Sequence, residues 1–257
     1  MQFLEITEKE YTKFWEDSKQ KSFLSSPKIS SLRKELNWET YFVGVKDNSK
    51  LLGAALIYAR KTKLNTKEFY SPRGLLVDYK DEKLLTYFVN NLKEFIKKHN
   101  GYILRIDPYV IYKERDIDGN IVEGGLDNSK VVENLSKLGF KKASNPEQVT
   151  WMFSLNLEGK TEEEIFKEMR PNVRNYIRKA EKIGIDVREL SKEELPKFQS
   201  IMEETGARKN FKVRKLSYFE KMYDLFHDTN EVKYFITELN LDKYISNLQK
   251  EIDEKEE

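Results

Sequence analysis

The stretch YFVGVKDNSKLLGAALIYA, residues 41–59, decides the fold of the first half of the chain. Its two apolar runs, 41–45 and 51–59, have the length and the character of buried strands. Between them lies the polar segment KDNSK, residues 46–50, whose residue types are those of a hairpin turn. We therefore predict two antiparallel strands joined by a short loop.

Helices and further strands alternate outward from this hairpin. Residues 7–19 have an amphipathic pattern with aromatic residues on one face, and Thr7 and Glu10 have the spacing of a capping box. The other elements expected in the first half are helices at 30–36, 81–100 and 129–138 and strands at 67–70, 102–106 and 150–155. This alternation predicts an α/β (α+β) fold in which helices flank a mixed sheet.

The second half repeats part of this pattern. We expect helices at 161–183, 191–205 and 215–226, strands at 185–190 and 232–238, and a charged helix from 241 onward. The aromatic strand at 232–236, like the one at 39–43, follows two helices, which indicates a weak internal repeat. Since the strands that complete the first unit have no counterpart, the predicted organisation is a first unit at 1–155, a partial second unit at 156–240 and a final helix at 241–257.

Composition excludes several classes of function. Hydrophobic residues make up 39% of the 257 residues, enough for a core, and the formal net charge of +2 requires no nucleic-acid partner. The absence of cysteine excludes disulfides, thiolate zinc sites and a cysteine nucleophile, and two histidines argue against a histidine metal site. No apolar run approaches the ~20 residues of a membrane span, and the first residues lack a signal-peptide pattern. We expect a cytoplasmic protein without a transmembrane segment.

A basic stripe is the most informative local feature of the second half. Arg170, Arg174, Arg178 and Lys182 stand four residues apart and share one helical face, and Pro171 suits the first turn of such a helix. The stripe suits phosphates, either of a nucleotide diphosphate or of a tRNA end. A solvated helix face has the same pattern, so both interpretations stay open.

A second cationic feature is the segment TGARKNFKVRKLSY, residues 205–218, which places five cations between two helices. Arg214 and Tyr218 are four residues apart, so a guanidinium and a phenol face one phosphate if both point outward. The competing interpretation is a basic turn with Tyr218 packed on the core.

Two predicted strand ends carry polar groups in the first half. Arg73 and Gly74 follow the strand at 67–70, and a glycine there lets the backbone approach a ligand closely. Asp107 ends the strand at 102–106, where α/β sheets often place a site. The structural alternatives are an ion pair between Arg73 and Asp78 and a turn capped by Asp107. The sequence has no metal-binding, P-loop or dinucleotide motif.

Together these segments resemble the Fem family of peptidoglycan-bridge aminoacyltransferases over essentially the whole chain. The resemblance rests on the order and spacing of short matches. In the first half they are FLSSP (23–27), NWETYFVGV (37–45), YSPRG (70–74), VDY (77–79), IDPY (106–109), DGNI (118–121) and KLGF (137–140). In the second half they are NVR (172–174), IRKA (177–180), Gly184, the segment 195–203, Thr205, Arg208 and Phe211.

The resemblance implies both the fold and the reaction. Family members contain two GNAT-type units, many with a helical arm in the second, so residues 241–257 correspond to the start of that arm. The rest of the arm and the closing strands of the second unit are then expected to be missing from this chain. Members transfer an amino acid from aminoacyl-tRNA, a co-substrate rather than a cofactor, to the stem-peptide amine of UDP-MurNAc-pentapeptide or lipid II. Use of lipid II implies peripheral contact with a membrane.

The resemblance also implies residue roles. Arg33, Arg214 and Tyr218 correspond to precursor-binding residues of the family, although the family has a lysine where Arg33 stands. Asp107 corresponds to a strand-end aspartate considered as a general base. The candidate site residues are therefore Asp107 for catalysis, Arg33, Arg73, Arg208, Arg214 and Tyr218 for the precursor, and Arg170, Arg174, Arg178 and Lys182 for tRNA or other phosphates.

The implied chemistry agrees with the scarcity of nucleophiles in this chain. An aminoacyl ester is already activated, so its aminolysis needs only positioning, worth ~7–11 kcal/mol, and removal of the ammonium proton, worth ~10²–10⁴-fold. The alternative is a truncated, catalytically inactive module that binds the precursor or tRNA. An acyltransferase that uses acyl-CoA is disfavoured, because no glycine-rich phosphate turn follows a central strand.

Overall fold

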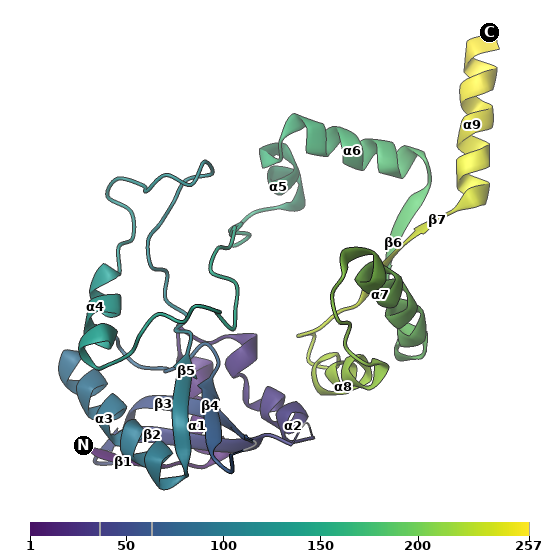
Figure 1. The fold of residues 1–257 in the computed structure, drawn as a ribbon. Coiled ribbons are helices and arrows are strands. Elements are labelled where there is room, and N and C mark those ends of the chain that lie inside the picture. Colours follow the sequence, from purple (N-terminus) through teal and green to yellow (C-terminus); the bar gives the residue numbers. More distant parts are fainter. Residues whose placement is uncertain (36, 63, 257) are drawn as a thin grey trace. The chain divides into compact units, whose positions relative to one another are not determined.

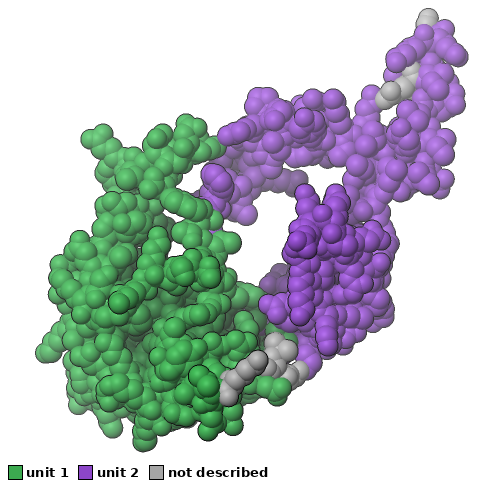
Figure 2. Space-filling model, in the orientation of Figure 1, with its two compact units in different colours: residues 1–151 green, residues 152–257 purple. Residues whose placement is uncertain are grey.

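The computed structural model describes residues 1–35, 37–62 and 64–256. The chain forms two compact units, residues 1–151 and residues 152–257, coloured green and purple in Figure 2. The finer predicted boundaries at 155 and 240 stay a prediction. Among the described helices, none combines the length and the apolar character needed to span a bilayer.

A mixed sheet organises the first unit, in the part that the structure describes (Figure 1). Its strands are β1 (Gln2–Glu5), β2 (Glu39–Asp47), β3 (Lys50–Lys61), β4 (Lys67–Ser71) and β5 (Gly101–Ile106), in that spatial order. Neighbours from β1 to β4 pair antiparallel, whereas β5 runs parallel to β4. The predicted hairpin is confirmed as β2–β3, and both strands continue into the polar segment so that only Asn48 and Ser49 form the turn.

Helices cover both faces of this sheet, as expected for the predicted fold class. They are α1 (Glu8–Asp17), α2 (Pro27–Glu35), α3 (Glu82–Lys98) and α4 (Ser129–Lys137), with the short 3-10 helix η1 (Phe23–Ser25) before α2. Helix α3 buries Phe88 and Leu92 against Ile57 and its neighbours on one face. Side chains alternate across a strand, so Tyr58 lies on the opposite face, where α1 and α2 contact the hairpin.

The second unit is mainly helical. Its elements are α5 (Glu162–Glu168), α6 (Pro171–Lys182), β6 (Ile185–Glu189), the 3-10 helix η2 (Lys192–Glu194), α7 (Leu195–Lys209), α8 (Leu216–Phe226), β7 (Phe235–Leu239) and α9 (Leu241–Glu256). Strands β6 and β7 pair antiparallel in a two-stranded sheet of the described residues. Phe219, Phe226 and Tyr234 are buried and form part of the core beneath α8.

Two expected elements are wrong. Residues 150–155, all of them described, form no strand, and Trp151 and Phe153 are 72% and 91% exposed. A strand needs a hydrogen-bonded neighbour, and this segment has none in the described structure. The single helix expected at 161–183 is two helices, because the chain turns at Met169 and Arg170 before Pro171, which lacks the N–H that a continuous helix would use.

Candidate functional site

Asp107 lies at the sheet edge where the parallel strands β4 and β5 both end. Its Oδ1 accepts a hydrogen bond of 2.8 Å from the backbone N–H of Arg73, and its Oδ2 accepts one of 3.3 Å from the Tyr70 hydroxyl. The Nε atom of Arg73 is 4.0 Å from Oδ2. Among the described contacts, Arg73 therefore pairs with Asp107 rather than with Asp78, and the carboxylate is held by groups from β4 and from the turn after it.

Burial sets the electrostatics of Asp107. Removal from water raises the pKa of this carboxyl above its usual value, although the Arg73 backbone N–H, the Arg73 charge and the Tyr70 hydroxyl each lower it. The side chain remains 19% exposed, so solvent or a ligand reaches it. A carboxylate whose pKa is raised and which stays accessible is suited to accept a proton.

Tyr70 is fixed as the hydrogen-bond donor to Asp107. Burial raises the pKa of the Tyr70 phenol well above its ordinary value, so the hydroxyl keeps its proton. The amide Nε2 of Gln148 donates to the same hydroxyl oxygen at 3.3 Å, which leaves the O–H free to point at the carboxylate. Tyr70 belongs to the segment YSPRG that resembles the family, but nothing in the sequence indicates its contact with Asp107 or any role for Gln148.

The turn after β4 uses its residues differently from the prediction. Arg73 itself adopts the left-handed conformation, with φ +50°. Gly74 is needed for space, because a Cβ there would lie 2.4 Å from the Ser71 hydroxyl oxygen. The Arg73 guanidinium lies 5.3 Å above the Tyr109 ring, and its side chain is 12% exposed. Arg73 is thus held over the Asp107 edge of the sheet.

Arg33 belongs to the same face of the first unit. Its guanidinium lies 5.6 Å from the Tyr58 ring and 5.7 Å from the Trp38 ring. Tyr58 and Tyr70 are directly opposite each other in the β3–β4 register and therefore share a face. A continuous row of side chains thus runs from Arg33 through Tyr58 and Tyr70 to Asp107.

The structure places a hollow of about 480 Å³ beside this row. It is lined by Asn37, Trp38, Glu39, Arg60 and Lys61. The Arg60 guanidinium lies 4.8 Å from the Trp38 ring, so two cations flank one indole. The nearby Tyr58 hydroxyl is buried and has no hydrogen-bond partner among the described atoms.

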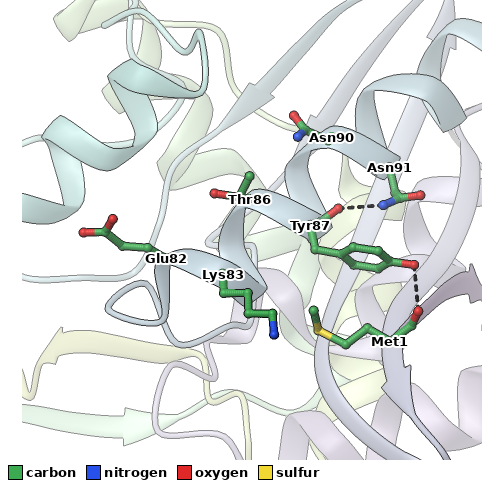
Figure 3. Close-up of a pocket in the computed structure, with 7 residues that line it drawn as sticks. All are labelled: Met1, Glu82, Lys83, Thr86, Tyr87, Asn90 and Asn91. Atoms are coloured by element: carbon green, nitrogen blue, oxygen red, sulfur yellow. Dashed lines mark hydrogen bonds between the residues drawn. The ribbon is translucent and has the colours of Figure 1, made fainter.

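A second hollow, of about 590 Å³, lies between the N-terminus and α3 (Figure 3). Its lining residues are Met1, Glu82, Lys83, Thr86, Tyr87, Asn90 and Asn91. The Tyr87 hydroxyl donates to the Met1 carbonyl at 2.9 Å, and the Asn91 amide donates to the Tyr87 carbonyl at 2.8 Å. Since none of the predicted site residues lines this hollow in the described structure, we assign it no part in the candidate site.

In the second unit, Arg214 lies beside Tyr218, and Tyr218 also packs against the core. The Arg214 guanidinium lies 5.2 Å from the Tyr218 ring, and the same ring meets the buried Phe219 edge-on with centroids 5.7 Å apart. Arg214 is exposed and Tyr218 is half-buried. Arg208 is exposed in the last turn of α7. The assignment of Arg33, Arg214 and Tyr218 to the precursor stays a prediction.

The basic stripe on α6 is divided by its contacts with α5. Nη1 of Arg174 donates to the carbonyl of Lys167 at 2.8 Å and also to the carbonyl of Met169, which closes the C-terminus of α5. The Arg178 guanidinium lies 5.3 Å from the ring of Phe166 on α5. Arg170 and Lys182, at the two ends of the stripe, are exposed. Arg174 and Arg178, in the middle of the stripe, therefore contact α5, which their spacing in the sequence did not indicate.

Among the described residues, no three His, Cys, Asp or Glu side chains gather as a metal site would require. We define the strand-end cluster as Tyr70, Arg73, Asp107 and Gln148.

Comparison with known proteins adds an independent line of evidence. The FemAB family model matches residues 6–257. Aminoacyltransferase FemA of Staphylococcus aureus strain bovine RF122 / ET3-1 is 33% identical over 260 residues, covering 98% of this chain and 61% of FemA. FemA of strain N315 gives the same identity and coverage. The crystal structure of FemX matches with a TM-score of 0.73 at 25% identity, over 99% of this chain and 62% of FemX. The chain thus spans about three-fifths of the length of these relatives.

Proposed function

This chain belongs to the FemAB family, and we propose that it acts as an aminoacyltransferase that moves an amino acid from aminoacyl-tRNA to the stem-peptide amine of a peptidoglycan precursor. The relatives named aminoacyltransferase match 98% of the chain, which supports the reaction class. The observation that carries the proposal is the strand-end cluster, which presents an accessible carboxylate of raised pKa within the matched part of the chain.

In the proposed reaction, the precursor amine attacks the ester carbonyl of the aminoacyl-tRNA. The new C–N bond forms, the ester C–O bond breaks, and the ribose hydroxyl of the tRNA leaves. Asp107 accepts the proton that the amine nitrogen loses as the C–N bond forms, and it gives this proton to the departing ribose oxygen. The Arg73 N–H and the Tyr70 O–H keep Asp107 in one orientation during both transfers. General-base help of this kind contributes ~10²–10⁴-fold.

We propose that cations from each unit bind the precursor. Arg33 and Arg73 lie on the Asp107 face of the first unit and offer guanidinium groups to phosphate or carboxylate. Arg208, Arg214 and Tyr218 are the corresponding candidates of the second unit. UDP-MurNAc-pentapeptide and lipid II both carry a diphosphate and a peptide, so either fits this chemistry.

The second candidate function is a module that binds the precursor or tRNA without turnover. The observation that favours it is the exposure of Arg208 and Arg214, which can bind phosphate without taking part in a reaction.

Transfer of a labelled amino acid from charged tRNA to UDP-MurNAc-pentapeptide or lipid II distinguishes the two candidates. We expect turnover by the wild-type chain and a ~10²–10⁴-fold lower kcat for Asp107→Asn, with precursor affinity unchanged in calorimetry. Binding without turnover supports the module. A folded chain that shows neither transfer nor binding at millimolar precursor contradicts both.

A further inference from the structure

A short segment after α4 contacts the sheet close to Asp107. We define the strap as residues 144–149, SNPEQV, all of which the structure describes. Among the described residues, the strap makes no backbone hydrogen bond to another segment. Two polar side-chain contacts attach it to the sheet: Glu147 pairs with Arg105 on β5, and Gln148 donates to the Tyr70 hydroxyl on β4. The position of the strap therefore depends on these side chains.

The two contacts reach residues that are neighbours in the sheet. Tyr70 and Arg105 are paired in the parallel β4–β5 register, so their side chains share a face. Two consecutive strap residues, Glu147 and Gln148, thus contact two side chains that lie next to each other across the ladder. Gln148 is half-buried, whereas the other strap residues are exposed. The Gln148 amide is therefore the part of the strap that reaches the strand-end cluster.

The Gln148 amide by itself is a weak attachment. Its hydrogen bond to the Tyr70 hydroxyl is 3.3 Å long, which exceeds the ~2.7–3.2 Å that is typical of an N–H donor. An ion pair at the preceding residue keeps the amide near the hydroxyl and so raises its effective concentration there. The Arg105 and Glu147 side chains are 45% and 38% exposed. An ion pair of this exposure changes the population of the attached strap by up to about fivefold and weakens as salt rises.

We propose that the Arg105–Glu147 ion pair holds the strap on the sheet during the transfer reaction. Gln148 then keeps the Tyr70 hydroxyl directed at Asp107. The inference rests on the proposed function, in which Asp107 is the base. Because the amide occupies one lone pair of the Tyr70 oxygen, the O–H donates to Oδ2 of Asp107, at 3.3 Å. Arg105 and Glu147 are positioning residues, since they act through Gln148.

A second exposed ion pair of the first unit provides the comparison. Lys97 pairs with Glu94 on α3, and both side chains are exposed. These residues are three positions apart on one helix, so their contact is local. Arg105 and Glu147 are 42 positions apart, and their contact joins β5 to a segment that has no secondary structure of its own. Loss of the α3 pair should therefore leave the strap unchanged, whereas loss of the Arg105–Glu147 pair should release it.

The test removes each ion pair without changing the net charge. Arg105→Gln/Glu147→Gln is the strap variant, and Glu94→Gln/Lys97→Gln is the matched control. Because the chain contains no cysteine, Asn145→Cys gives a single site for a nitroxide label on the exposed part of the strap. Electron paramagnetic resonance then reports strap mobility, after circular dichroism confirms the fold. We expect higher mobility in the strap variant, and in the labelled wild-type background at high KCl, but not in the control.

A second measurement follows Asp107 itself. Carbon-13 NMR gives the titration midpoint of its carboxyl, and Asp107→Asn assigns the resonance. Gln148→Ala should shift this midpoint, and the strap variant should shift it in the same direction by no larger amount. Combined with Gln148→Ala, the strap variant should add no further shift, because the ion pair acts through that amide. In the transfer assay, kcat should fall by up to about fivefold with the precursor KM unchanged.

Three results would overturn the proposal. The first is equal strap mobility in the strap variant and the control. The second is an Asp107 midpoint that the strap variant shifts equally with and without Gln148, because the two charges then act on the carboxyl directly. The third is a higher kcat in the strap variant, since the strap would then obstruct the site. Both spectroscopic measurements use the chain without substrates, so a wild-type chain that fails to transfer contradicts the enzyme proposal alone.

Discussion

The backbone N–H of Arg73 donates a 2.8 Å hydrogen bond to Oδ1 of Asp107, joining the turns that follow two neighbouring parallel strands. The bond ties residues 34 positions apart in the sequence, so it exists only once β5 has paired with β4. The orientation of the proposed base therefore depends on the pairing of β4 with β5. Substitutions at this end of the sheet should change the transfer reaction.

Tyr70→Phe should move the acidic limb of the pH profile for transfer to higher pH. The Tyr70 hydroxyl favours the ionised form of Asp107, so its removal raises the pKa of a carboxyl that burial already raises. A hydrogen bond worth about 0.5–1.5 kcal/mol corresponds to a shift of roughly half to one pH unit in kcat/KM. Gln148→Ala keeps the donor and should shift the limb less. If the acidic limb of the pH profile stays in place in Tyr70→Phe, Asp107 does not take part in the rate-limiting proton transfer.

Gly101→Ala should destabilise the first unit by about 1–3 kcal/mol. Gly101 begins β5, and a Cβ there would lie 2.4 Å from Ile96 Cγ2 and 2.5 Å from Phe69 Cε2. Urea unfolding measures the loss. Ile96→Ala removes one of the clashing groups. The double variant should therefore lose less free energy of unfolding than the sum of the losses of the two single variants. If the two losses are strictly additive, the contact between the new Cβ and Ile96 does not cause the destabilisation.

Arg174→Ala should loosen α5, although the residue belongs to the basic stripe. Its guanidinium closes the C-terminus of α5 through two carbonyls, and the loss of such half-exposed bonds costs about 1 kcal/mol. Faster amide hydrogen exchange in α5 is the expected signature. Arg170→Ala, which removes an exposed cation of the same stripe, is the matched control and should leave α5 exchange unchanged. Equal exchange in both variants would contradict the structural role of Arg174.

Glu10 should make the stability of the first unit depend on pH in the acid range. The Lys46 ammonium, and then the backbone and hydroxyl of Thr7, lower the pKa of Glu10 from 4.5 to about 2. A lowered pKa in the folded state gives stability that is complete above pH 4.5 and is lost as pH falls toward 2. Glu10→Gln should therefore be less stable than the wild-type chain at neutral pH, and the difference in urea midpoint should vanish near pH 2. A constant difference would mean that the charge of Glu10 is not involved.

Features that depend on near neighbours in the sequence are predicted well. The capping box of Thr7 with Glu10 is confirmed, because it links residues three positions apart. The β2–β3 hairpin is confirmed for the same reason, since its turn and its two apolar runs are contiguous. The strand expected at 150–155 is wrong because strand formation depends on a partner that the segment itself cannot specify.

The sequence by itself determined the family, the mixed sheet with its flanking helices, and the place of Asp107 at the end of a strand. The tertiary structure decided what surrounds that carboxylate: Tyr70 reaches it across 37 positions and Gln148 reaches Tyr70 across 78. It also decided that Arg174 and Arg178 contact α5, whereas Arg170 and Lys182 at the two ends of the stripe are exposed. Spacing along a helix reports which cations share a face, but only packing shows which of them already have a partner.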